Sequence, residues 1–572
     1  LKYLRRALQG SPDALFLNGL IAYYEGRYAD ALAAIRRDPA SPQAVRLEAR
    51  IYRAQGSDAA RAGEYEQADR LFVQAGDIYG GLAQRFPSDP DLYLEDCERR
   101  TRQILGAMAR ASVPEERVKE MLAACDRTLL VDPGMSDALV LEAAVVWRQG
   151  AQERKRGTDP TARLADAVRL LERAIAREPR NARIYPELAS AHLVLAQWQI
   201  EHGTDAGVAL AAGIAAASKA VEMQPDMASA HSSLGSAHLL RARYQQRGGI
   251  DPRPELLKAV ESLQRASDLS PRLLSASFGL GNTWNLMAEV QIARGEDPTR
   301  SIGQAVAALE VAAGLNPRSA AICNTLGNTH LTYGEYLLAR GEDPRQAFNR
   351  AAASYRRGIE LMPDDFMVYY NLGYTWRSLG EALLTQKQDP RPALAQAGAV
   401  LEKALRLNPG DSEVFLERAR VKRVAARWRL QQRQDPTPDL REAVAELGRA
   451  EALNPRQADV LFTQALIARD RAETARDARG RAAALREGLE RIGKALAVNG
   501  SEARYLALRG QLEEMSARLE ADPHQREEQA RRALATLEAA LRANPLLQRE
   551  YGAALADARL DAGAVSPRPR QL

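Results

Sequence analysis

The chain contains 572 residues with a formal net charge of +5, so its surface is nearly balanced in charge and shows no bulk attraction to nucleic acid. Hydrophobic residues make up 46% of the chain and aromatic residues only 5%, and its wealth of alanine, leucine and arginine favours helices over a β-rich fold. No apolar run reaches the roughly 18 residues that a membrane span requires, so we expect no membrane segment within this chain.

Prolines that end helical stretches recur every 46 residues. The series comprises Pro87, Pro133, Pro179, Pro225, Pro271, Pro317, Pro363, Pro409 and Pro455. A second series runs in phase with it through Pro114, Pro160, Pro252, Pro298, Pro344, Pro390 and Pro436, with Ala206 in place of one proline. Proline interrupts the helical hydrogen-bond ladder, and apolar residues recur at three- and four-residue spacing between these marks. Each unit is therefore predicted to hold two helices, an A helix and then a B helix.

In chain order, residues 1–12 have the pattern of the end of a B helix without its A helix, which suggests a chain cut from a longer protein. Residues 12–42 predict a short hairpin that crosses over within 19–32. In the unit after Pro363 the A helix should run from about Asp365 to Thr385 and the B helix from about Pro390 to Leu407. After Pro455 the spacing falls to 45 residues, and a capping helix should run over about 546–561.

An aspartate precedes most prolines of the second series, at Asp159, Asp251, Asp297, Asp343, Asp389 and Asp435. Aspartate is a preferred N-cap, and proline is tolerated in the first turn, where its missing N–H costs no hydrogen bond. We therefore predict that each of these aspartates is the N-cap of a B helix.

Three A helices carry a similar motif: FGLGNTW at 278–284, NTLGNTH at 324–330 and YNLGYTW at 370–376. This motif resembles the tetratricopeptide repeat (TPR), in which a small residue of the A helix packs against alanines and a large apolar residue of the B helix. Gly373, Ala397, Leu401 and Ala404 occupy the corresponding positions. The resemblance implies an all-α fold, a right-handed α-solenoid of stacked helical hairpins. It also implies that Gly281, Gly327 and Gly373 permit close helix packing.

The resemblance also suggests a division of the chain. Residues 1–87 would hold N-terminal TPR-like repeats, 88–455 eight extended 46-residue units, 456–561 divergent units with the capping helix, and 562–572 a disordered tail. The family's A-helix leucine is replaced by Glu142, Arg418 and Gln464 in three units. We expect those units to pack in a shifted register.

No motif for catalysis, phosphate binding or metal binding occurs, so we expect no enzyme activity, no cofactor and no metal. Cys97, Cys125 and Cys323 are odd in number and lack a C-x-x-C pair, which predicts neither a disulfide framework nor a zinc site. Three histidines share one repeat position with two tryptophans, which favours packing there: His192, His238 and His330 with Trp284 and Trp376. A packing role is expected for His231 and Cys323 as well. The Asn-Gly-Ser of 499–501 is interpreted as a turn rather than a glycosylation site.

In the TPR family the A helices line a concave groove that holds peptides. Transferred to this chain, the groove positions are Phe278, Asn282, Asn324, Asn328, Tyr370 and Tyr374. Asparagine is a poor former of helix interiors, and its amide can bond an extended peptide backbone. The alternative is that the asparagines are merely tolerated on a solvated face or belong to the ancestry of the repeat.

Basic residues cluster between Glu417 and Arg433. Arg420, Arg423 and Arg427 share one helix face, which by the repeat register points into the groove beside Arg377. We expect Arg377, Arg420 and Arg423 to bind an acidic or phosphorylated end of a peptide. The alternative is a solvated run of charge.

The sequence thus predicts a non-catalytic scaffold that binds a partner protein or peptide. Its units resemble the repeat regions of bacterial serine/threonine protein kinases, which implies a docking or sensor region of a larger signalling protein. The alternative is the repeat region of an enzyme such as a glycosyltransferase. RNA binding is disfavoured because the basic stripe is local. The cytoplasm is favoured over the periplasm, and the oligomeric state stays open.

Overall fold

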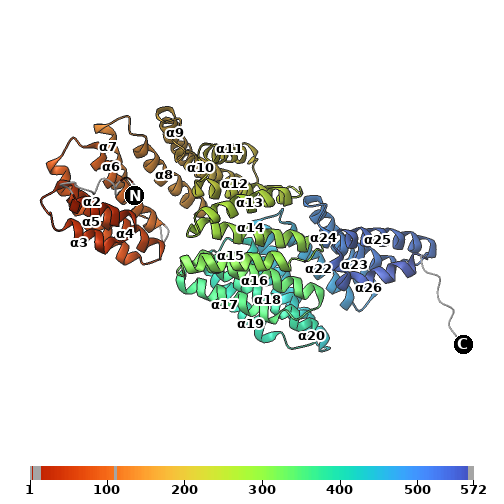
Figure 1. Ribbon diagram of the computed structural model, residues 1–572. Coiled ribbons are helices and arrows are strands. Elements are labelled where there is room, and N and C mark those ends of the chain that lie inside the picture. The colour runs from red at the N-terminus through yellow and green to blue at the C-terminus, as the bar shows by residue number, and fades with distance from the viewer. Residues whose placement is uncertain (1–2, 4–13, 109–112, 564–572) are drawn as a thin grey trace. The chain divides into compact units, whose positions relative to one another are not determined.

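The structure is a computed structural model that describes residue 3 and residues 14–108 and 113–563. Within these residues the regular elements are 25 α-helices and one 3₁₀ helix, η1 (Pro545–Leu547), and no strand occurs among them. Within each compact unit, consecutive helices pack in pairs as hairpins and neighbouring hairpins contact one another, as α4 and α5 do with α6 and α18 and α19 do with α20 (Figure 1). The predicted all-α stack of helical hairpins is confirmed.

The A helices are α2 (Ala14–Tyr24), α4 (Pro42–Arg61), α6 (Pro90–Met108), α8 (Ser136–Lys155), α10 (Ile184–Glu201), α12 (Ala228–Arg247), α14 (Leu274–Ala293), α16 (Ala320–Arg340), α18 (Phe366–Thr385), α20 (Ser412–Gln431), α22 (Ala458–Thr474), α24 (Ala503–Ala517) and α26 (Gln548–Asp561). The B helices are α3 (Tyr28–Ile35), α5 (Tyr65–Arg85), α7 (Glu115–Val131), α9 (Thr161–Arg177), α11 (Gly207–Met223), α13 (Arg253–Leu269), α15 (Thr299–Leu315), α17 (Arg345–Leu361), α19 (Arg391–Leu407), α21 (Thr437–Leu453), α23 (Ala478–Val498) and α25 (Pro523–Ala543).

The helix boundaries follow the proline series. From α12 to α22 every A helix begins 46 residues after the preceding one. The predicted helices over 365–385 and 390–407 are α18 and α19, the predicted hairpin over 12–42 contains α2 and α3, and the predicted capping helix is α26. Most of the expected B-helix end at 1–12 and most of the expected tail at 562–572 lie outside the described residues.

The chain divides into two compact units. The first unit comprises 1–247, 254–279 and 311–318, and the second comprises 248–253, 280–310 and 319–572. None of the described helices combines the length and the apolar character that crossing a bilayer demands.

The aspartates before the B helices do not have the predicted position. Pro390, and not Asp389, is the N-cap of α19, and the carboxylate of Asp389 accepts a hydrogen bond from the backbone N–H of Arg391 at 3.0 Å. This is an Asx turn, in which the side chain bonds the backbone two residues further along the chain. The same bond is made by Asp159, Asp205, Asp251, Asp297, Asp343 and Asp435. Each aspartate therefore lies one residue before the N-cap and accepts a hydrogen bond from a backbone N–H in the first turn of the B helix, which has no partner within the helix.

The glycines of the A-helix motif allow the close packing that the sequence predicts. A Cβ added to Gly327 would lie 2.4 Å from the ring of Tyr355 on α17, and one added to Gly373 would lie 2.5 Å from Leu401 on α19. Gly281 stands in the same relation to Leu309 on α15, at 2.4 Å. Real Cβ atoms do not approach so closely, so these positions require glycine.

Replacing Gly327 by alanine should destabilise the protein by about 1–3 kcal/mol, because the new methyl group displaces the buried ring of Tyr355. Chemical denaturation measures the change. As a control, Gly303→Ala in α15, where a Cβ meets no atom within 4 Å, should be neutral or slightly stabilising. Equal stability of Gly327→Ala and the wild type would contradict the packing.

The units with a polar residue in place of the family's leucine do not shift in register. Helices α20 and α22 begin at the same repeat position as α18. The substituted side chains instead bond carboxylates of α21: Arg418 pairs with Glu446 at 2.9 Å, and the Gln464 amide donates to Glu451 at 2.7 Å. The expected shift is therefore wrong, because Arg418 and Gln464 find carboxylate acceptors on α21 without a change of register.

Glu142 of α8 lies in a different environment. Burial raises the pKa of its carboxyl to about 7, and the negative charge of Asp126 acts in the same direction. Since an unfolded glutamate titrates near 4.5, the folded chain holds more protons between these two pH values. Stability should therefore fall as the pH rises through this window.

Glu142→Gln should remove this dependence. Relative to the wild type, the variant should gain about 1–2 kcal/mol of stability between pH 5 and pH 8, since an amide has no charge to desolvate. Urea melts at the two pH values measure the gain. The exposed Glu261→Gln of α13 should show none, and parallel pH profiles of Glu142→Gln and wild type would contradict the assignment.

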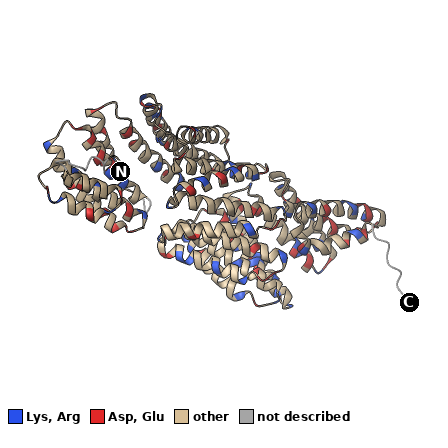
Figure 2. Ribbon diagram, in the orientation of Figure 1, with Lys and Arg blue, Asp and Glu red and all other residues tan. Residues whose placement is uncertain are grey.

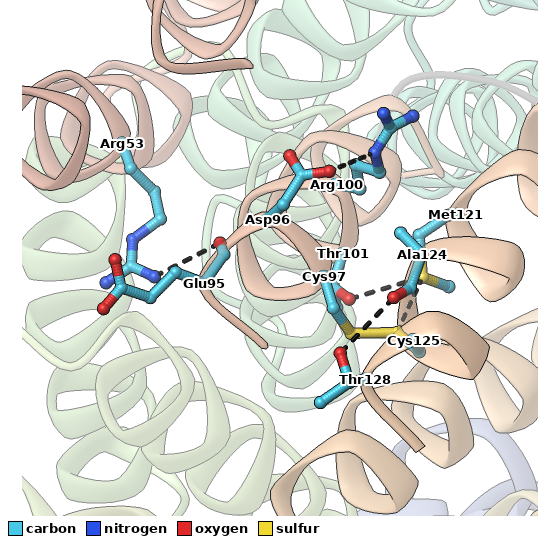
Figure 3. The surroundings of a disulfide bond; sticks show 10 residues. All are labelled: Arg53, Glu95, Asp96, Cys97, Arg100, Thr101, Met121, Ala124, Cys125 and Thr128. Atoms are coloured by element: carbon cyan, nitrogen blue, oxygen red, sulfur yellow. Dashed lines mark hydrogen bonds and ion pairs between the residues drawn. A yellow bond between two sulfur atoms is a disulfide. The ribbon is translucent and has the colours of Figure 1, made fainter. Parts of the chain in front are cut away.

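Two of the three cysteines form a disulfide, contrary to the expectation from their number. Cys97 of α6 and Cys125 of α7 are joined, with their Cα atoms 5.0 Å apart (Figure 3). Both are fully buried, and Met121 and Thr101 lie beside the bond. The pairing could not be predicted from a sequence separation of 28 residues, because only the packing of α6 on α7 brings the two side chains together. Cys323 remains free and half-buried, and burial raises the pKa of its thiol.

In the second unit, the C-terminal segment contacts the ends of much earlier helices. The Asn544 amide donates to the carbonyl of Ile292 in α14 at 3.3 Å, and the Arg549 guanidinium donates to the carbonyl of Leu338 in α16 at 2.6 Å. These carbonyls lie in the last turns of their helices, and each also accepts a hydrogen bond from a backbone N–H of the following turn, that of Gly295 at 2.9 Å and that of Gly341 at 3.0 Å. Asn544 and Arg549 therefore cap α14 and α16 from more than 200 residues further along the chain.

Candidate functional site

Polar side chains connect successive A helices of the second unit, and they include most of the predicted groove residues. The Asn371 amide of α18 donates to the side-chain oxygens of Asn324 at 2.9 Å and Asn328 at 3.3 Å, both on α16. One step further, Arg377 of α18 bonds Glu417 of α20. We call the face of α16, α18, α20 and α22 that carries these bonds the A-helix face.

Asn324 and Asn328 lie one helical turn apart and are half-buried. Besides the bonds from Asn371, the Asn328 oxygen accepts a hydrogen bond from the Tyr355 hydroxyl at 2.6 Å. In the described bonds both asparagines act through their oxygens only. Each therefore keeps an amide NH₂ group, which can donate to an incoming carbonyl.

The two predicted tyrosines lie side by side on α18. The ring centroids of Tyr370 and Tyr374 are 6.5 Å apart, and the Tyr374 hydroxyl donates to Glu335 of α16 at 2.6 Å. Burial raises the pKa of Glu335, although this hydrogen bond opposes the rise. The tyrosines thus provide partly exposed aromatic surface beside the asparagines.

Arg377 has partners within the protein. Its residue is only 5% exposed, and its guanidinium bonds Glu417, which is fully buried, and Glu381 at 2.6 Å. The guanidinium also lies over the ring of Tyr374, 4.4 Å from its centroid. Arg377 is therefore part of a buried ion pair between α18 and α20.

Arg420 and Arg423 of α20 are likewise paired, with α22. Arg420 bonds Asp459 at 3.2 Å and the hydroxyl of Thr463 at 3.3 Å, and Arg423 bonds Asp470 at 2.7 Å. Burial alone would raise the pKa of Asp470, but Arg423 and Arg469 outweigh it and hold that pKa below its usual range. The structure thus gives each of the three predicted arginines a carboxylate partner.

Phe278 and Asn282 lie on α14. Phe278 belongs to the first unit, and Asn282 to the second. Both engage other residues of the protein. The predicted site residues that the structure brings together are therefore those of α16, α18 and α20. Phe278 is excluded from this group because it belongs to the other unit.

Four carboxylates of this face were absent from the sequence prediction: Glu335, Glu417, Asp459 and Asp470. A regular spacing could have revealed three of these partners. Tyr374 and Glu335 are 39 residues apart, Arg377 and Glu417 are 40 apart, and Arg420 and Asp459 are 39 apart. Each of these separations is one repeat less six or seven residues, whereas the other side-chain bonds between adjacent A helices of this face span 43 or 47 residues.

The histidines at the shared repeat position are partly or fully buried among other residues of the protein. His238 bonds Glu255 at 2.7 Å, and burial lowers the pKa of His192 and of His330. His231 does more than pack, because its ring bonds the carbonyl of Pro225 at 2.9 Å and so closes the preceding turn. Among the described residues no group of three His, Cys, Asp or Glu side chains is arranged to hold a metal ion.

The Asn-Gly-Ser segment forms the predicted turn. The side-chain oxygen of Asn499 accepts hydrogen bonds from the backbone N–H of Ser501 at 3.3 Å and from its hydroxyl at 3.2 Å. Asn316 and Asn544 make the corresponding backbone bond at the same place in their units. The asparagine therefore has a structural role in ending the B helix.

Positive and negative residues are interspersed over the helices (Figure 2). Within the predicted basic cluster, five cations have carboxylate partners in the protein. They are Arg418 with Glu446, Arg420 with Asp459, Lys422 with Glu442, Arg423 with Asp470 and Arg429 with Asp439. Most of the positive charge of the cluster is thus compensated internally.

No protein family and no curated protein matches the chain in sequence. Among solved structures, yeast Tom70 is similar over 88% of this chain and 98% of its own, with 14% identity and a TM-score of 0.35. Human IFIT1, in a dimer with PPP-AAAA, is similar over 79% of this chain and 94% of its own, with 15% identity and a TM-score of 0.36. The Cut9–Hcn1 hetero-tetramer of APC/C is similar over 89% and 98%, with 13% identity and a TM-score of 0.35. Similarity at this level carries no functional argument, so function is argued from the residues.

Proposed function

We propose that the chain is a non-catalytic scaffold whose A-helix face binds an extended segment of a partner protein. The observation that carries this proposal is the pair of asparagines on α16. Their oxygens are occupied by Asn371 and Tyr355, and their amide NH₂ groups remain as donors one helical turn apart. Donors that are fixed in this way suit the carbonyls of an extended backbone, which supplies acceptors at regular intervals.

The neighbouring groups extend the same surface. Tyr370 and Tyr374 supply an aromatic surface for an apolar side chain of the segment. Arg377, Arg420 and Arg423 hold α18, α20 and α22 together through buried ion pairs. They therefore fix the shape of the face, and ligand contact is assigned to Asn324, Asn328, Tyr370 and Tyr374.

The finer context rests on the sequence resemblance. The extended TPR-like units with their Gly-Glu-Asp-Pro turns favour a docking or sensor region of a larger bacterial signalling protein, such as a serine/threonine kinase. The alternative, the repeat region of a glycosyltransferase, predicts a catalytic domain of that type in the same gene product. Reading the complete gene decides between them.

The peptide-binding assignment is tested with Asn328→Asp. This change keeps a side-chain oxygen for Tyr355 and Asn371 but replaces the NH₂ donor by a second acceptor. Peptides selected from a random nine-residue library on the wild-type chain should bind the variant about 1–3 kcal/mol more weakly by calorimetry. The matched control is Asn349→Asp, an exposed position of α17, which should bind as the wild type does. Equal binding by all three proteins would remove Asn328 from the site.

A further inference from the structure

Of the six basic residues within α20, one lacks the internal carboxylate partner that the other five have. Among the described residues Arg427 makes neither a hydrogen bond nor an ion pair, although it is half-buried. It lies one turn after Arg423 on the same helix face, and the guanidinium of Arg423 is held by Asp470 of α22. Arg427 is therefore a partly desolvated positive charge without a counter-charge of its own.

The repeat shows what is missing at this position. Glu381 of α18 and Glu473 of α22 stand 46 residues before and after Arg427. In those helices the carboxylate pairs with an arginine one turn earlier: Arg377 with Glu381 at 2.6 Å and Arg469 with Glu473 at 3.7 Å. In α20 the pattern Arg-x-x-x-Glu has become Arg-x-x-x-Arg, so the unit lacks the carboxylate that its neighbours supply.

Arg427 lies among other charged groups of the second unit. They are the guanidinium groups of Arg423 and Arg469 and the carboxylates of Asp470 and Glu473, and Arg469 also interacts with the carboxylate of Glu550. Burial lowers the pKa of Arg427, and the neighbouring positive charge of Arg423 lowers it further. The two carboxylates nearest to Arg427 already have arginine partners of their own, Asp470 with Arg423 at 2.7 Å and Glu473 with Arg469 at 3.7 Å.

We propose that Arg427 binds one carboxylate of the segment that occupies the A-helix face, and that this carboxylate takes the place held by Glu381 in α18. The inference rests on the proposed peptide binding and specifies its chemistry. The carboxylate comes from an aspartate or glutamate side chain or from a peptide C-terminus. A phosphate group, with its charge of about −2, fits less well, because the carboxylates of Asp470 and Glu473 near Arg427 would repel it more strongly than they repel a monoanion.

The probe is a degenerate library of nine-residue peptides with free and with amidated C-termini, in which glutamate, glutamine and phosphoserine are each allowed at every position. On the wild-type chain, peptides with glutamate at one fixed position should bind about tenfold more tightly than their glutamine analogues. The preference should vanish in Arg427→Gln and persist in Arg441→Gln, an exposed position of the B helix α21. Loss of the preference on amidation would identify a C-terminal carboxylate as the source, and its retention a side chain.

A second variant gives a readout that needs no peptide. Arg427→Glu restores the Arg-x-x-x-Glu pattern of α18, so its melting temperature should be at least that of the wild type, and its preference for glutamate should be lost. A melting temperature well below that of the wild type would overturn the inference, as would a glutamate preference that survives in Arg427→Gln or a stronger preference for phosphoserine. Peptide binding by the wild type without any acidic preference would overturn this inference alone. Failure of every peptide to bind would overturn the proposed function as well.

Discussion

Glu417→Ala should destabilise the second unit by about 3 kcal/mol, because it removes the fully buried one of the two carboxylates that neutralise Arg377 and leaves only the partly exposed Glu381. Glu417 is fully buried and Arg377 is 5% exposed, so water cannot replace the lost partner. Arg420 would lose a second carboxylate contact at 3.5 Å. Chemical denaturation followed by circular dichroism measures the loss.

Two further variants test the cause. Replacing both partners, as Arg377→Met with Glu417→Leu, should recover most of the loss, because a well-packed apolar pair needs no desolvation of charge. Glu402→Ala removes an exposed partner of Arg406 in α19 and should cost at most about 0.5 kcal/mol. If the double variant were as unstable as Glu417→Ala, the uncompensated charge could not be the reason for the loss.

Reduction of the Cys97–Cys125 disulfide should lower the stability of the first unit by about 3–4 kcal/mol. The bond closes a loop across the α6–α7 hairpin, with a sequence separation of 28 residues, and so restricts the unfolded chain. Each hairpin contacts mainly its neighbours, so the loss should appear as early unfolding around α6 and α7. Thermal melts with and without a thiol reductant measure the change.

The control for the reduction is Cys323→Ser, which removes the free thiol. This variant should respond to the reductant as the wild type does, and titration of its denatured, unreduced form should find no free thiol. Three titratable thiols in the unreduced wild type, or a melting profile insensitive to the reductant, would contradict the bond.

The helix boundaries could be predicted because each is marked by local chemistry. A proline ends or begins almost every helix of the repeat, so α18 and α19 lie within one residue of the predicted ranges. The role of Gly327 could also be predicted, because a small residue that recurs at one position of the repeat indicates close packing between helices. The prediction that Asp389 is the N-cap was wrong. In both an N-cap and an Asx turn the aspartate accepts a hydrogen bond from a backbone N–H of the first turn, but in the Asx turn it lies one residue before the cap.

Contacts between helices could not be predicted in the same way. The disulfide depends on which faces of α6 and α7 meet, and neither cysteine carries a local mark of its partner. The basic cluster on α20 was visible as a run of charge, but the carboxylates that neutralise it lie on α21 and α22. Whether an arginine such as Arg423 is free or paired depends on which residues of the adjacent helix lie opposite it. The 46-residue period alone does not give this register.

Photocrosslinking tests the central claim most directly. A peptide selected on the wild-type chain, carrying a diazirine side chain, is irradiated in complex with the full chain, and the adducts are mapped by mass spectrometry. The account predicts adducts within the A helices α16, α18 and α20, over 320–340, 366–385 and 412–431. Adducts confined to the B helices α17, α19 and α21, or to the first unit, would contradict it.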